Sequence, residues 1–216
     1  MSASSTSSEQ ASAGFRHERK LWRSGVYYVA GVDEAGRGPL AGPVVAAAVL
    51  VTPGFEIEGV EDSKTLAPAE RERLCALITA GAPSVGVGIV DHETIDRVNI
   101  LNATFLAMHR AIAGLKPRPQ HVLVDGNRFT PGDDGVPYTT LVGGDARSFS
   151  IAAASIVAKV TRDRIMLQLD SEYPAYGFCR HKGYATPEHR AAILKYGLCP
   201  VHRRSFTIRW QLELSL

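Results

Sequence analysis

Residues 31–43 read GVDEAGRGPLAGP, and this stretch sets the architecture that the rest of the chain follows. It begins inside a mostly apolar segment, residues 26–33, which predicts a β-strand that ends on Asp33. Glycines and a proline within residues 36–39 break that strand. Residues 43–51 then predict a second strand, almost wholly apolar, as is typical of a strand buried on both faces of a sheet.

The periodicity of apolar residues predicts the other elements. Further strands are expected at residues 84–91, 121–125 and 138–142. Helices are expected at residues 68–80, 95–112, 150–169 and 187–196. The first strands have short connections and are expected to be antiparallel, whereas a later strand follows a helix, as a parallel crossover requires. The expected fold class is therefore α/β, with a mixed sheet flanked by helices.

The composition of the chain fits one globular domain. Of its 216 residues, 45% are hydrophobic, which is enough for a substantial core. Residues 1–14 are rich in serine and alanine and are expected to form a disordered tail, so the domain itself is placed at residues 15–216. The longest apolar run is far shorter than the ~20 residues that a membrane helix needs, and no membrane contact is expected.

The cysteines indicate a cellular compartment but no site. Cys75, Cys179 and Cys199 are an odd number and show no C-x-x-C pair, which argues against a disulfide framework or a zinc site. Idle thiols in a reducing environment are the simpler interpretation, so a cytoplasmic protein is expected.

Charge is unevenly distributed along the chain. The formal net charge is +2, but the first hundred residues are net acidic and the remainder is net basic. The segment from Tyr176 onward is the most basic of all. Such an end fits a polyanionic partner, because each phosphate contact releases counterions. A solvated basic surface explains the same pattern equally well.

Two of the predicted strands end in acidic residues. Asp33, with Glu34 after it, ends the first strand, and Asp125 ends the strand at 121–125. If these strands lie parallel and adjacent, their acids meet at one edge of the sheet, where α/β folds usually place sites. Grouped carboxylates raise one another's pKa unless a cation offsets them, and Mg²⁺ prefers such oxygen ligands. Two ions ~4 Å apart can activate a water and stabilise the leaving oxygen of a phosphodiester.

The loop that follows Glu34 favours a substrate site over the alternative, in which each acid caps a turn or a helix. It places Gly36, Arg37 and Gly38 beside the acids. Glycines let the backbone approach a substrate closely, and a guanidinium can bind a phosphate or hydroxyl with two donors. The combination predicts a metal-dependent nuclease.

These segments together resemble the ribonuclease HII family, the type 2 ribonucleases H. The resemblance starts with residues 31–43 and continues through D-S-K-x-L at 62–66, N-I-L-x-A-T at 99–104 and VLVDGN at 122–127. It extends through AAASIVAKVTRD at 152–163, YGF at 176–178, HKGY at 181–184 and HRRSF at 202–206. Roughly residues 28–206 are covered, and so many ordered motifs make coincidence a poor explanation.

The resemblance implies a ribonuclease H-like fold, with a mixed five-stranded sheet and a C-terminal helical segment. It implies a metal-dependent endoribonuclease that hydrolyses RNA paired with DNA. It also implies incision on the 5′ side of ribonucleotides embedded in duplex DNA, as in ribonucleotide excision repair, leaving 3′-hydroxyl and 5′-phosphate ends. The implied partner is an RNA/DNA hybrid or a DNA duplex that contains ribonucleotides, and the implied cofactor is Mg²⁺ or Mn²⁺, with two ions.

The resemblance assigns the catalytic and metal-binding roles to four acids. The family's first three acids correspond to Asp33, Glu34 and Asp125. Its fourth acid lies in a K-G-D or K-A-D element before the long helix, and we place it at Asp145. Gly143 stands here where that lysine is usual.

Other acids offer alternatives for the fourth position. Asp163 follows Asp145 by about four to five helical turns and is a second candidate. The acids at positions 133 and 134 lie in a Gly/Pro-rich turn and fit solvated loop residues.

The resemblance also implies how the substrate is read. RNA differs from DNA by the 2′-hydroxyl, and the family contacts it with the backbone of the G-R-G loop, here Gly36, Arg37 and Gly38. A tyrosine, here Tyr184, stacks on the sugar that follows the ribonucleotide. Phosphate contacts, which position a duplex without reading its sequence, are expected from Lys64, His181, Lys182, Arg203 and Arg204. Ordinary surface charge is the alternative for each of these five.

Two other functions remain in competition. A strand-transfer or junction nuclease of the same broad fold would keep the acids, but it need not carry the G-R-G loop or Tyr184. A hybrid-binding protein without catalysis would have a broken set of acids, whereas all four are present here. Nothing in the sequence suggests a subunit interface, and a monomer is expected.

Overall fold

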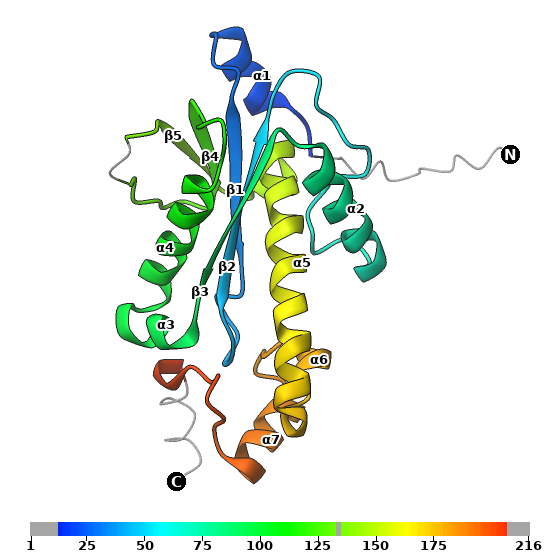
Figure 1. Ribbon diagram of the computed structural model, residues 1–216, viewed down its shortest axis with the longest axis vertical. Coiled ribbons are helices and arrows are strands. Elements are labelled where there is room, and N and C mark those ends of the chain that lie inside the picture. The colour runs from blue at the N-terminus through cyan, green and yellow to red at the C-terminus, as the bar shows by residue number, and fades with distance from the viewer. Residues whose placement is uncertain (1–12, 133–134, 207–216) are drawn as a thin grey trace, which may run out of the picture.

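The structure is a computed structural model that describes residues 13–132 and 135–206. At its centre is a five-stranded sheet in the order β3-β2-β1-β4-β5 (Figure 1). The strands are β1 (Val29–Ala35), β2 (Val44–Val51), β3 (Ser84–Val90), β4 (His121–Asp125) and β5 (Tyr138–Leu141). β2 is antiparallel to both of its neighbours, whereas β4 is parallel to β1 and β5 is parallel to β4. The mixed sheet predicted from the connections is confirmed.

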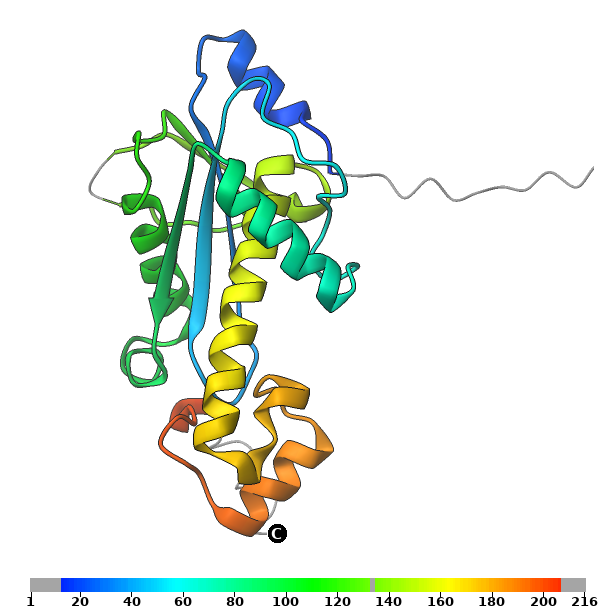
Figure 2. The same cartoon turned by 45° about the vertical axis from the view of Figure 1, so that its right-hand side comes forward.

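Helices cover both faces of this sheet, as Figures 1 and 2 show. On one face α5 (Phe149–Glu172) packs along β1 and β2, with α2 (Pro68–Gly81) beside it. On the other face lies α4 (Ile100–Ala113), which α3 (His92–Val98) precedes. The short helices α6 (Phe178–His181) and α7 (Pro187–Tyr196) pack at one end of α5, and α1 (Arg16–Arg23) lies at the other end. Within the described residues, no helix has the length and apolar character needed to cross a bilayer.

β2 holds the two halves of the core together, because all eight of its residues are buried. Ala47 and Val49 belong to the apolar cluster under α5. Ala48 and Leu50, which alternate with them, belong to the cluster under α4. The prediction that this strand is buried on both faces is confirmed.

Two glycines set how closely the helices approach the sheet. A Cβ on Gly31 of β1 would lie 2.0 Å from the carbonyl carbon of Ser150 in α5. A Cβ on Gly88 of β3 would lie 1.9 Å from the carbonyl oxygen of Ala107 in α4. Glycine at position 88 thus allows α4 to pack directly on β3. Because Gly31 lies two residues before Asp33, the same contact fixes that acid relative to α5.

Three local features differ from the sequence predictions. The single helix predicted at 95–112 is wrong: Asn99 adopts a positive φ of 66° and its side chain caps α4 by accepting from the amides of Leu101 and Asn102. α1 was not predicted, because it is short and depends on tertiary contacts. Ala13 is buried and the carbonyl of Gly14 accepts from the amide of Phe149, so these two residues belong to the domain, and the rest of the predicted tail lies outside the described residues.

A first prediction concerns the packing of β3 on α4. We expect Gly88→Ala to lower the free energy of unfolding by about 3 kcal/mol, since the new methyl group would overlap the Ala107 carbonyl and force the helix away from the sheet. Urea unfolding followed by circular dichroism measures this. Gly14→Ala is the matched control, because nothing lies within 4 Å of a Cβ there. Equal stability of the two variants would contradict the packing.

Candidate active site

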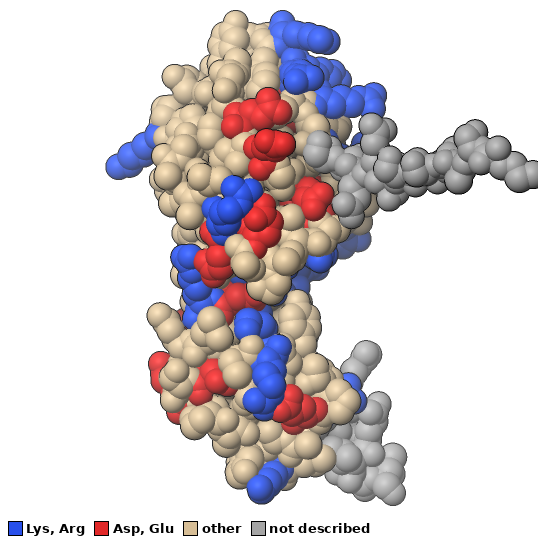
Figure 3. Space-filling view, turned by 90° about the vertical axis from the view of Figure 1, so that its right-hand side faces the viewer, with Lys and Arg blue, Asp and Glu red and all other residues tan. Residues whose placement is uncertain are grey.

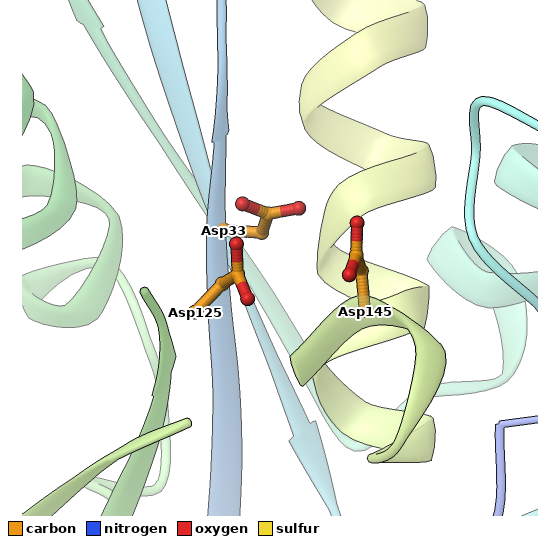
Figure 4. Close-up of side chains that lie close together, drawn as sticks. All are labelled: Asp33, Asp125 and Asp145. Atoms are coloured by element: carbon orange, nitrogen blue, oxygen red, sulfur yellow. The ribbon is translucent and has the colours of Figure 1, made fainter. Parts of the chain in front are cut away.

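The register of two strands brings the first two acids together. β1 and β4 run parallel, with Val32 opposite Val124, so that Asp33 and Asp125 follow side by side. Asp145 comes from the 3₁₀ turn Gly144–Ala146, just before α5. Each of these three aspartates offers one carboxylate oxygen, and the three oxygens lie within 4.8 Å of one another. Figure 4 shows their side chains converging from β1, β4 and that turn.

Backbone amides and one lysine hold the carboxylates in place. The amide of Gly144 donates to Asp125 Oδ1 at 2.7 Å, which ties the turn to the end of β4. Lys64 Nζ donates to Asp145 Oδ2 at 2.8 Å. The amide of Glu34 donates to Asp33 Oδ1 at 2.7 Å. The acids are therefore positioned before any ligand arrives.

The cluster carries more negative charge than its surroundings offset. Burial raises the pKa of Asp33 well above its usual range, and the nearby carboxylates of Glu34 and Asp125 raise it further. Burial also raises the pKa of Asp125. The hydrogen bond to Asp145 raises the pKa of Lys64 to about 12, so this lysine is a partial counter-charge. Buried carboxylates that repel one another favour a bound cation.

The donor set suits a hard divalent cation. Three carboxylates converge, and two of them, Asp33 and Asp145, are only 5% exposed. Mg²⁺ and Mn²⁺ prefer carboxylate oxygens, whereas zinc sites use histidine and cysteine as well. The residues that converge here therefore fit a magnesium or manganese centre.

Glu34 is not one of the three converging acids. Its Oε1 is 3.2 Å from Nη1 of Arg37, within the loop that follows β1. Burial raises the pKa of Glu34, and the guanidinium of Arg37 opposes that rise. The structure thus brings three of the four predicted acids together and pairs the remaining one with Arg37.

The alternatives for the fourth acid have other surroundings. Asp163 accepts from Lys159 Nζ at 2.8 Å, one turn away on α5, and does not belong to the group of three. The acids at positions 133 and 134 lie outside the described residues. Among the candidates that can be compared, Asp145 is the one beside Asp33 and Asp125.

One pocket joins the acids to the residues expected to read the sugar. It has a volume of about 360 Å³. Among the residues that line it are Asp33, Glu34, Gly36, Arg37, Gly38, Lys64, Asp125 and Tyr184. The ring of Tyr184 is 46% exposed, and a Cβ on Gly38 would lie 3.6 Å from it. The loop and this tyrosine, distant in the sequence, thus form one wall.

Two buried arginines hold the loop in its conformation. Arg203 is fully buried and donates to the carbonyls of Gly36, Arg37, Gly42 and Pro43. Arg162 is 1% exposed and donates to the carbonyls of Ala41, Pro43 and Lys182. The expectation that Arg203 contacts phosphates is therefore wrong, because its guanidinium donates to backbone carbonyls beneath the loop.

The other predicted phosphate contacts fall into two groups. His181 is buried, and its Nε2 hydrogen-bonds the carbonyl of Tyr176, so it is also a structural residue rather than a surface contact. Lys182 is half-buried, and its ammonium donates to the carbonyl of Cys179. Lys64 and Arg204 are exposed. The basic character of the C-terminal segment thus serves the fold as well as the surface.

Sequence reasoning missed a role for Ser155. Its hydroxyl lies 2.7 Å from that of Ser63, it lines the same pocket as Asp33, and its hydroxyl partly offsets the rise in the pKa of that acid. Ser155 is 4% exposed and lies among alanines. The D-S-K element was the available signal, since it places Ser63 beside Lys64.

Comparison with known proteins gives the family. The family model for ribonuclease HII matches residues 30–209. The chain belongs to the ribonuclease HII family. The ribonuclease HII of Acetivibrio thermocellus is 53% identical over 191 residues, which cover 88% of this chain and 74% of that one. The ribonuclease HII of Geobacter metallireducens is 53% identical over 196 residues, covering 88% of this chain and 91% of that one.

Solved structures agree with this membership. Ribonuclease H2 from Pyrococcus horikoshii OT3 superposes with a TM-score of 0.72 at 30% identity, over 87% of this chain and 98% of that one. The ribonuclease HII solved in a complex with PCNA from Archaeoglobus fulgidus gives a TM-score of 0.70 at 27% identity, over 84% of this chain and 96% of that one. As a ribonuclease HII, the chain is a hydrolase, an endoribonuclease of the ribonuclease H type that produces 5′-phosphomonoesters.

A second prediction follows from the repulsion among the acids of this ribonuclease HII. A raised pKa in the folded state means that Asp33 stabilises the fold at low pH and loses that contribution as pH rises through the raised value. We therefore expect Asp33→Asn, without divalent metal, to be more stable than the wild type at about pH 8, by roughly 1 kcal/mol or more. The difference should shrink toward about pH 5.

Urea unfolding in a chelating buffer at the two pH values measures this difference. Asp163→Asn is the matched control, because its carboxylate is paired with Lys159 and its removal has no repulsion to relieve. A wild type that is as stable as Asp33→Asn at the higher pH would show that the carboxylates do not repel one another.

Proposed function

We propose that this chain hydrolyses the RNA strand of RNA/DNA hybrids and incises on the 5′ side of ribonucleotides embedded in duplex DNA, leaving 3′-hydroxyl and 5′-phosphate ends. One observation carries the proposal: the carboxylates of Asp33, Glu34 and Asp125 line a single pocket together with the loop at residues 36–38 and Tyr184. Groups suited to hydrolysis and groups suited to binding a ribose thus line the same pocket.

Asp33, Asp125 and Asp145 are the residues that would hold the divalent ions, and Glu34, which lines the same pocket as Asp33 and Asp125, is the fourth candidate ligand. Magnesium or manganese bound there would supply charge stabilisation for the phosphodiester and lower the pKa of an attacking water. The nucleophile in this proposal is water, and no covalent enzyme intermediate forms. The buried hydroxyl of Ser155 is hydrogen-bonded to that of Ser63, so it is not the nucleophile in this proposal.

The loop would recognise the 2′-hydroxyl through its backbone. Gly36 adopts a φ of +97°, and a Cβ there would lie 2.0 Å from Nε of Arg162. Glycine is therefore required both for the conformation and for the contact beneath. Because Arg162 and Arg203 bind the carbonyls on the buried side, the loop is rigid before the substrate binds, which lowers the entropic cost of recognition.

Tyr184 would stack on the sugar that follows the ribonucleotide. Its exposed ring lies beside Gly38 and 6.0 Å from the guanidinium of Arg162. Lys64, Lys182 and Arg204 are the remaining candidates for phosphate contacts. Such contacts orient the duplex across the pocket and leave recognition to the loop and the tyrosine.

The cellular role that fits this activity is ribonucleotide excision repair, in which the incision starts removal of the ribonucleotide. All three cysteines are free, as suits a reducing compartment, and we place the protein in the cytoplasm. We propose that it acts as a monomer, because the three acids, the loop and Tyr184 all come from one chain.

A third prediction tests the activity directly. A labelled DNA duplex with one ribonucleotide should be cut on its 5′ side in Mg²⁺ or Mn²⁺, while the all-DNA duplex of the same sequence stays intact. Asp125→Asn should lower the rate at least about a hundredfold, since it removes a charge from the centre of the cluster. Asp163→Asn keeps the cluster and should cut normally. Equal cleavage by wild type and Asp125→Asn, or cleavage of the all-DNA duplex, would falsify the proposed function.

A fourth prediction tests recognition of the sugar by Tyr184 separately from the hydrolysis itself. Tyr184→Ala should lower kcat/KM on the embedded ribonucleotide about tenfold or more, the value of one stacking contact. The effect should be smaller on a long RNA/DNA hybrid, where every sugar of the cut strand is a ribose. Tyr196→Ala is the matched control, because that ring is similarly exposed at 52% but does not line the pocket. A loss of the same size on both substrates would remove the proposed role of Tyr184.

A further inference from the structure

One face of α1 is strongly basic. Arg16, Lys20 and Arg23 are spaced four and three residues apart, so they share one side of the helix. All three are exposed. Among the described residues, no ion pair involves any of them, so their charge is not neutralised by a neighbouring acid. Figure 3 shows basic side chains gathered at the end of the molecule where α1 lies.

The acidic residue of α1, Glu18, makes its contacts inside the domain. Glu18 is fully buried, and its Oε1 accepts from the hydroxyl of Ser148 and from the amide and hydroxyl of Ser150. These serines begin α5, where the positive end of the helix dipole favours a carboxylate. Phe15 stacks on Phe149 at a centroid distance of 4.3 Å beside this contact. α1 is therefore fixed on the domain with its cations facing outward.

α5 gives the order of the functional features along the molecule. Ser150 holds α1, Ser155 lines the pocket beside Asp33, and Arg162 lies beneath the reading loop and Tyr184. At about 1.5 Å per residue, these points follow one another at intervals of roughly 8 and 10 Å. The acids therefore lie between α1 at one end and Tyr184 at the other.

Arg147 connects the basic face to the acids. It is exposed and lies two residues after Asp145. It directly precedes Ser148, whose hydroxyl donates to Glu18 of α1, so Arg147 lies where α1 is attached to the start of α5. The basic surface thus continues from α1 to the turn that carries the third acid.

We propose that the basic face of α1, with Arg147, binds the phosphate backbone of the duplex on the 5′ side of the cut. This inference rests on the proposed function, in which Tyr184 takes the sugar that follows the ribonucleotide on the 3′ side. On the 5′ side of the cut, the duplex then extends from the acids toward α1. With one phosphate per ~3.4 Å of each strand, the roughly 8 Å of α5 between Ser155 and Ser150 corresponds to about two to three phosphates.

The first test measures affinity as a function of salt. The variant Arg16→Gln/Lys20→Gln/Arg23→Gln is compared with Arg73→Gln/Lys116→Gln/Lys195→Gln, which removes the same charge from exposed positions on other elements. Both are made in an Asp125→Asn background so that the duplex stays intact, and dissociation constants come from fluorescence anisotropy. The α1 variant should bind roughly tenfold more weakly at low salt, and its log–log salt slope should fall by about 2 to 3, at about 0.9 per lost contact.

A charge-conserving variant separates contact from folding. Arg16→Lys/Arg23→Lys keeps the cations and should bind as tightly as the wild type, since phosphate contact requires charge rather than a guanidinium. Thermal unfolding of all variants confirms that α1 stays folded. The proposal is overturned if the glutamine variant and its control bind equally, because the face would then be an ordinary solvated surface.

The second test fixes the side of the contact. One duplex carries its ribonucleotide near the 3′ end of the cut strand, with a long 5′ arm, and another carries it near the 5′ end, with a long 3′ arm. The α1 variant should lose affinity only for the duplex with the long 5′ arm. Loss confined to the long 3′ arm would overturn the assignment. Binding to an all-DNA duplex separates this inference from the proposed function. Because α1 contacts phosphates, it should bind this duplex even if the protein does not cut at ribonucleotides.

Discussion

The parallel pairing of β1 with β4 is the constraint on which the site depends. That register places Asp33, two residues before the end of β1, beside Asp125, the last residue of β4, and the turn before α5 adds Asp145. The fold thereby forces like charges to within 4.8 Å of one another, an arrangement that costs stability until a cation binds. The core around them is correspondingly rigid: β2 is buried on both faces, and Gly31 lets α5 lie directly on β1.

A second arrangement converts this metal-binding edge into a site that can select a sugar. Arg162 and Arg203 bring two positive charges beneath the loop at residues 36–43 and satisfy its carbonyls. Burial lowers the pKa of Arg162 to about 10 and that of Arg203 to about 9, so both stay charged at neutral pH. Within residues 13–132 and 135–206, no carboxylate forms an ion pair with either guanidinium, and backbone carbonyls, most of them in the loop, are their hydrogen-bond partners.

Much of this organisation could be predicted from the sequence, because it depends on local patterns. The wholly apolar β2 and the acids that follow the apolar residues of β1 and β4 are each encoded within a few residues. The predicted end of the first strand at Asp33 is wrong by two residues, because β1 continues to Ala35 in its pairing with β2. Asp145 and Tyr184 required the family resemblance, since nothing local links either of them to β1.

The features that sequence reasoning did not reach depend on contacts between distant segments. A motif rich in arginine cannot reveal that Arg203 is fully buried while its neighbour Arg204 is exposed. The pairing of Glu34 with Arg37 and the capping of α5 by Glu18 are likewise choices among partners that only the folded chain offers. Asn99 divides a helix through its backbone conformation, which apolar periodicity does not register.

The bonds from Arg203 to the loop have a consequence for synthesis of the protein. A ribosome makes the acids of β1 and β4 and the loop itself long before it adds residue 203. Until then the carbonyls of Gly36 and Arg37 lack the guanidinium that holds them. A nascent chain can therefore form the sheet and gather its carboxylates while the ribose-reading loop is still unsupported. Selectivity would be acquired last, once translation has passed the segment that follows α7.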